Sequence, residues 1–142
     1  MIKVFEGGTC NNSKWRDVLE TKLDSACALN MIELFNPVVD DWNAEAQKRE
    51  VLYKENCDFQ LFVITPKMTG VFSIAEAIDC SNKNPEKCIF CILQEDEGDA
   101  FTDGQMKSLI QTSKMIINNG GHAYASIKSV ADYLMTKSIV YK

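Results

Sequence analysis

Short apolar runs alternate with amphipathic stretches along the chain. The runs DFQLFVIT at 58–65 and KCIFCIL at 87–93 show this most clearly, because few of their residues are polar. Runs of this length and composition are typical of strands that are buried on both faces of a sheet. Shorter runs predict three further strands, over 2–8, 32–38 and 122–127.

Between the predicted strands, apolar residues recur at the three- and four-residue spacing of an amphipathic helix, as in VFSIAEAI at 71–78. Helices are predicted over 13–23, 44–56, 71–82, 105–118 and 130–137. Ser13, Asn43 and Ser129 precede or begin three of these stretches, so each is expected to act as an N-cap. An acidic loop is expected at 94–103.

This alternation predicts an α/β fold. The 142 residues fit a single three-layer α/β/α domain over 1–142, with a mostly parallel sheet of about five strands, of the flavodoxin or Rossmann type. Ligands of such sheets bind beyond the carboxyl ends of the strands, where the strand order reverses. The loops expected to meet there are 7–9, 40–42 and 68–72.

Charge and hydropathy narrow the classes of partner. The net charge of −5 argues against a nucleic-acid partner, which requires clustered Lys and Arg. No apolar run approaches the length of a membrane span, and the N-terminal residues IKVFEGG do not have the pattern of a signal peptide. We therefore expect a cytoplasmic protein without a membrane partner.

The six cysteines suggest a disulfide framework or a metal site at first sight. The only CxxC pair, Cys88 and Cys91, lies inside a predicted strand, where residues three apart point to opposite faces. These two thiols therefore cannot share a metal ion, and the presence of a single histidine argues against a zinc site with Cys and His ligands. We expect reduced, mostly buried thiols, with no metal and no cofactor.

Glu76 raises the main functional question. It follows the strand 58–65 and a loop with Pro66 and Gly70, and on a helix it lies about 200° from Ile74, away from the apolar stripe. A solvated acidic face explains this position, and so does a reactive carboxylate at the mouth of an α/β fold. The residue pattern alone leaves both interpretations open. Gly7-Gly8 allows a tight turn but belongs to no GxGxxG or P-loop motif.

Three segments carry a resemblance to a known family: VFEGG, NPVVDDW and CDFQLFVITPKMTGVFSIAE. Together they resemble the nucleoside 2-deoxyribosyltransferase superfamily, and in particular its deoxyribosyltransferase-like branch. The resemblance covers about residues 2–93 and is most specific in the third segment. It implies an enzyme that cleaves or exchanges the N-glycosidic bond of a 2′-deoxynucleoside or its 5′-monophosphate. It also implies a homo-oligomer, a dimer or larger.

The resemblance implies catalytic roles for two carboxylates. Glu76 stands at the position of the nucleophile that attacks C1′, and a carboxylate suits an oxocarbenium-like transition state. Glu50 stands at the position of a second carboxylate, usually Asp, that assists the leaving base or the incoming acceptor. Phe5 stands where the family often has a Tyr, so a hydroxyl is lost and an aromatic surface is kept.

Phe5, Gly8, Asp41, Trp42, Thr69 and Gly70 are expected to form the substrate pocket. Gly70 lies six residues before Glu76, where the transferases carry an Asp for the 5′-hydroxyl and nucleotide N-hydrolases carry a Ser. Without a carboxylate there, a 5′-phosphate meets less repulsion. The closing residues SIVYK lack the Asn that completes transferase sites, which also favours a hydrolase.

The alternative from another class is a non-catalytic nucleotide-binding module on the same fold. The missing Asp and the replacement of Tyr by Phe5 favour it. A phosphorelay receiver has a similar topology but requires acidic residues after the first strand and an Asp at the end of the third. Here these strands end in Gly7-Gly8 and Thr65-Pro66.

Overall fold

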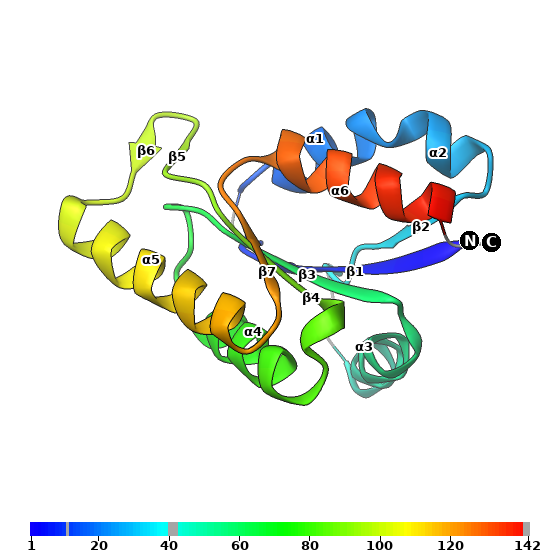
Figure 1. The fold of residues 1–142 in the computed structure, drawn as a ribbon, viewed down its shortest axis with the longest axis horizontal. Helices are drawn as coiled ribbons and strands as arrows, with labels where there is room; N and C mark the ends of the chain where they lie inside the picture. The colour runs from blue at the N-terminus through cyan, green and yellow to red at the C-terminus, as the bar shows by residue number, and fades with distance from the viewer. Residues whose placement is uncertain (11, 40–42, 141–142) are drawn as a thin grey trace.

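A computed structural model describes residues 1–10, 12–39 and 43–140 of the chain. A five-stranded, all-parallel sheet lies between two helical layers, which confirms the predicted α/β/α architecture (Figure 1). The strand order is β2-β1-β3-β4-β7. The strands are β1 (Ile2–Gly8), β2 (Ile32–Phe35), β3 (Phe59–Ile64), β4 (Cys88–Ile92) and β7 (His122–Tyr124).

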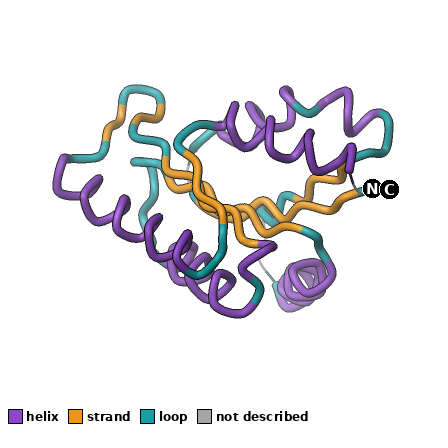
Figure 2. Tube along the Cα trace, viewed as in Figure 1, coloured by secondary structure: helices purple, strands orange, loops and turns teal. Residues whose placement is uncertain are grey.

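Helices cover both faces of the sheet, as the tube in Figure 2 shows. One face is covered by α1 (Trp15–Lys22), α2 (Asp24–Ala28) and α6 (Ile127–Val140). The other is covered by α3 (Ala44–Asn56), α4 (Phe72–Lys83) and α5 (Asp103–Asn118), with a 3₁₀ turn, η1 (Pro85–Lys87), after α4. None of the helices described combines the length and apolar character needed to cross a membrane.

Alternating side chains of the strands form two cores, one on each face. Val4 and Ile89 pack under α1 and α6, whereas Phe5 packs against the layer of α3, α4 and α5. Cys88 and Cys91 also fall in different cores. The prediction that these two thiols point to opposite faces is therefore confirmed.

Of the three predicted N-caps, one is confirmed and two are wrong. Asn43 caps α3 as expected, because its Oδ1 accepts a hydrogen bond of 2.8 Å from Ala46 N. Ser13 is not the N-cap of α1, because Lys14 takes that position; the Ser13 hydroxyl donates to the Asp96 carboxylate at 2.6 Å and accepts a long bond of 3.4 Å from Trp15 N. Ser129 also lies inside its helix, where its amide donates to the hydroxyl of Ser126.

The acidic segment predicted as a loop contains a small hairpin instead. Strands β5 (Glu95–Asp96) and β6 (Asp99–Ala100) pair antiparallel across Glu97 and Gly98. Both turn residues have positive φ, 47° and 91°, which matches the right-handed twist of a two-residue hairpin. The helix α2 was not predicted either, because five residues carry little periodic signal.

The end of β1 is held against β3 by backbone contact. Gly8 pairs with Val63, and its φ of 109° lies in the region that favours glycine. The following amide, Thr9 N, donates to Val63 O at 2.8 Å, while Thr9 Oγ1 accepts from Thr65 N at 3.0 Å. These contacts fix where the chain leaves β1, at the carboxyl edge of the sheet.

Replacing Gly8 by Ala is expected to destabilise the protein strongly. The added Cβ would lie 2.2 Å from Val63 O on a backbone with positive φ, so the two strands would have to separate. We expect a loss of roughly 2–4 kcal/mol in the free energy of unfolding, measured by urea denaturation. Gly70→Ala is the matched control, because its Cβ would meet no described atom within 4 Å. Equal stabilities of the two variants would refute the argument.

Glu6 is a buried carboxyl on the face of β1 that α1 covers. Its side chain is 0% exposed, and neither oxygen has a well-formed hydrogen bond within the described ranges. Burial, followed by the Glu20 carboxylate, raises the pKa of Glu6 from 4.5 to about 8, against the opposing effect of Arg16. Glu6 is therefore largely protonated at neutral pH in the folded protein.

This shift makes stability depend on pH. Between pH 4.5 and about 8 the folded protein keeps a proton that the unfolded chain has released, so the free energy of unfolding falls as the pH rises. We expect a fall on the order of 3 kcal/mol between about pH 5 and pH 8. Glu6→Gln should flatten this slope in urea denaturation, whereas Glu20→Gln should only lessen it, because burial, the main cause of the shift, remains. An unchanged slope in Glu6→Gln would contradict the buried-acid assignment.

Candidate functional site

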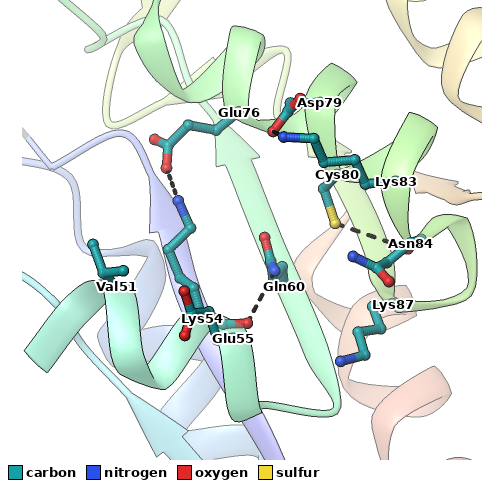
Figure 3. Close-up of a pocket in the computed structure, with 10 residues that line it drawn as sticks. All are labelled: Val51, Lys54, Glu55, Gln60, Glu76, Asp79, Cys80, Lys83, Asn84 and Lys87. Carbon is teal, nitrogen blue, oxygen red and sulfur yellow. Dashed lines mark hydrogen bonds and ion pairs between the residues drawn. The ribbon is translucent and has the colours of Figure 1, made fainter.

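Glu76 lies in the second turn of α4 and forms an ion pair with Lys54 of α3. Figure 3 shows the two side chains extended toward each other across the groove between the helices. The Glu76 side chain is 15% exposed, whereas Asp79, one turn later on α4, is 61% exposed. Asp79 thus fits a solvated acidic face, and Glu76 is largely shielded and paired.

Glu50 lies one turn before Lys54 on α3 and is half-buried. Burial and then the charge of Glu76 raise the pKa of Glu50, and Lys54 opposes this effect. Two carboxylates from different helices therefore interact with each other and with one ammonium group. Such a pair of carboxyls in unequal surroundings is a common arrangement for acid–base chemistry.

A cavity of about 250 Å³ brings together four of the residues predicted for the site: Phe5, Gly8, Glu50 and Glu76. They come from β1, α3 and α4, so the cavity lies where the strand order reverses at β1. Its walls are completed by Gly7, Cys10, Arg16, Pro37, Val38, Val39 and Ser73. The position agrees with the rule for ligand sites in open α/β sheets.

A second cavity of about 250 Å³ contains Thr69 and Gly70, the two predicted residues of the β3–α4 loop. It shares Gly8, Cys10 and Ser73 with the first cavity, so the two hollows adjoin at the end of β1. This second hollow opens at the start of α4, whose first turn carries no acidic residue. The amides of that turn give it a positive electrostatic character.

A third hollow, of about 370 Å³, lies on the other side of Glu76, between α3 and α4 (Figure 3). Gln60 forms part of its lining, and its charged residues balance in sign. These charged residues are Lys54, Glu55, Glu76, Asp79, Lys83 and Lys87. The carboxylate of Glu76 therefore stands at the boundary between this groove and the cavity that holds Glu50.

Phe5 lines the cavity but is buried, so it offers no exposed stacking surface. Its ring packs against Phe35, with centroids 6.1 Å apart, and against Phe62. The ammonium of Lys54 lies 5.5 Å from the centroid of the Phe5 ring. Phe5 offers no hydroxyl, and among the described residues Lys54 is the one that donates a hydrogen bond to Glu76.

Two basic residues at the site were missed by sequence reasoning. Lys54 could have been found from its spacing, because it is four residues after Glu50 on the same predicted helix. Arg16 is buried, and its guanidinium donates to the main-chain oxygens of Glu6 and Thr9 at 2.8–3.1 Å. No local pattern marks Arg16, which holds the loop after β1 in place.

Two of the residues predicted to form the pocket, Asp41 and Trp42, lie outside the described residues. Within 1–10, 12–39 and 43–140, no cluster of His, Cys, Asp or Glu has the arrangement of a metal site. Four of the cysteines, Cys57, Cys80, Cys88 and Cys91, are buried, and none of the described cysteines forms a disulfide.

Comparison with known protein families gives a match over most of the chain. The profile of the family described as nucleoside 2-deoxyribosyltransferase like matches residues 1–95. No curated protein matches the chain. The matched residues include every residue that lines the cavity of Glu50 and Glu76 and the adjoining cavity of Thr69 and Gly70. Because the match covers well over half of the chain, this protein belongs to the nucleoside 2-deoxyribosyltransferase-like family.

Proposed function

We propose that this protein cleaves or exchanges the N-glycosidic bond of a 2′-deoxynucleoside or its 5′-monophosphate, with Glu76 as the nucleophile. One observation carries the proposal. In a chain of this family, Glu50 and Glu76 reach one cavity from two helices, beyond the carboxyl end of β1.

The chemistry follows from the two carboxylates. An oxygen of Glu76 bonds to C1′ while the bond from C1′ to the base nitrogen breaks, and the base leaves with the electron pair. Glu50, whose pKa is raised, donates a proton to the departing base. Water or a second base then attacks C1′ and releases the Glu76 carboxylate, and Glu50 accepts a proton from the attacking group.

The adjoining cavity suits a 5′-phosphate. The amides at the start of α4 and the hydroxyls of Thr69 and Ser73 are donors for an anion. Gly70 leaves room as well, since a Cβ there would meet no described atom within 4 Å. We therefore assign the sugar and base to the cavity of Glu76 and the phosphate to the hollow beside Thr69, which favours a nucleoside monophosphate as substrate.

A non-catalytic nucleotide-binding module is the second candidate. Phe5 brings no hydroxyl to Glu76, and the carboxylate is engaged by Lys54. A pocket that retained its shape without its chemistry would show these same features. The two candidates differ in turnover and not in binding.

Replacing Glu76 by Gln should abolish turnover. The amide keeps the size of the side chain but cannot act as a nucleophile, so we expect a fall of roughly 1,000-fold or more in kcat. Base release from a panel of 2′-deoxynucleosides and their 5′-monophosphates, with and without a second free base, is measured by chromatography. Asp79→Asn is the matched control, because it removes a more exposed carboxylate from the same helix.

Turnover that survives in Glu76→Gln would overturn the assignment of the nucleophile. Tight binding of a nucleotide without base release, unchanged in Glu76→Gln, would favour the binding module. Base exchange with the second free base would identify a transferase, and release into water alone would identify a hydrolase.

Replacing Gly70 by Asp should discriminate between the two classes of substrate. A carboxylate beside the second cavity would repel a 5′-phosphate, so kcat/KM for monophosphates should fall roughly 10-fold or more. The value for nucleosides should change far less. Gly70→Asn adds the same bulk without charge and should keep most of the activity. Similar losses in both variants would show that space, and not charge, governs this position.

A further inference from the structure

The ion pair between Lys54 and Glu76 connects two helices in front of the sheet. The Nζ of Lys54 donates to Oε2 of Glu76, from α3 to α4 (Figure 3). The two side chains are 25% and 15% exposed, respectively. This contact differs from the pair formed by Lys83 and Asp79 within α4, whose side chains are 70% and 61% exposed. Exposed pairs of the latter kind contribute little to stability or position.

The surroundings of Lys54 hold its ammonium in place. The ring of Phe5, itself buried, lies behind the ammonium at 5.5 Å, within the range of a cation–π contact. Glu50 lies one helical turn earlier on α3. Burial and the charge of Glu76 raise the pKa of its carboxyl, and the charge of Lys54 opposes that rise. The ammonium is thus placed to interact with both carboxylates and to offset their mutual repulsion.

We propose that Lys54 is a positioning residue for the nucleophile, an inference that rests on the proposed function. Its side chain takes part in no bond-making step. By donating to Oε2 of Glu76 it leaves Oε1 for the sugar carbon and holds the carboxylate at the boundary of the Glu50 cavity. It provides the hydrogen bond to the carboxylate that the apolar ring of Phe5 cannot provide.

Removal of the ammonium has a defined physical consequence. Without it, the charge of Glu76 acts on Glu50 unopposed, and the Glu76 side chain, which Lys54 no longer holds, can turn away into the groove between α3 and α4. A displaced nucleophile reacts slowly even when the substrate is bound normally, because the reacting atoms are misaligned. The effect should therefore appear in kcat rather than in KM.

The test uses Lys54→Ala on whichever substrate the wild-type enzyme turns over. We expect kcat to fall roughly 100-fold while KM changes by less than about 3-fold. Lys54→Arg should keep much of the activity, since a guanidinium can still donate to the carboxylate. Added ethylammonium should restore part of the activity of Lys54→Ala, because it can enter the open groove and donate an N–H. Tetramethylammonium at the same ionic strength should not, because it has no N–H to donate.

Lys83→Ala is the matched control. It removes a lysine and an ion pair from the same groove without touching Glu76, so it should behave as the wild type. Circular dichroism and urea denaturation check that each variant is folded.

The outcomes separate this inference from the function on which it rests. Activity of Lys54→Ala equal to or above that of the wild type would overturn the inference, and the higher value would show that Lys54 restrains the nucleophile. A loss that neither Arg nor ethylammonium relieves would overturn it too. If Glu76→Gln abolishes base release and Lys54→Ala does not impair it, only the role of Lys54 fails. If the wild-type protein releases no base, the proposed function and this inference fail together.

Discussion

The parallel contact between β1 and β3 is the constraint on which the site depends. Gly8 lies so close to Val63 that only a residue without a side chain fits, and Thr9 continues the contact with hydrogen bonds to Val63 and Thr65. The guanidinium of Arg16 then donates to the main-chain oxygens of Glu6 and Thr9 and holds the chain in place at the end of β1. Both cavities therefore have Gly8 in their walls, and the two adjoin because this one turn is fixed.

Charge at the site is organised by two helices that pack on the same face of the sheet. Glu50 and Lys54 are one turn apart on α3, and Glu76 approaches from α4. Buried aromatic rings below, with Phe5 at the centre, reduce the access of water to this layer. Each charge consequently influences its neighbours more strongly than an exposed pair would. Glu6 is the contrasting case. Its carboxyl is buried without a well-formed hydrogen-bond partner, so its neutral form is favoured and its pKa is raised.

The sequence predicted the elements better than their ends. Continuous apolar runs and three- and four-residue spacing are local signals, and they located the strands and most of the helices. The predicted caps Ser13 and Ser129 were wrong because the helices begin at other residues, with Lys14 as the N-cap of α1 and Ile127 as the first residue of α6. The hairpin at 95–100 depends on two residues with positive φ, one of which, Glu97, has no intrinsic preference for it.

By itself, the sequence determined the fold class, the separation of Cys88 from Cys91 and the family, because each follows from local pattern or from contiguous motifs. It also indicated which carboxylates to examine. Only the tertiary structure decided that Glu76 is shielded and paired, since its partner Lys54 lies 22 residues away on another helix. The same holds for Arg16, whose acceptors are main-chain oxygens that carry no sequence signal. Contacts of this kind depend on how helices and loops pack over the sheet, and no periodicity along the chain records that packing.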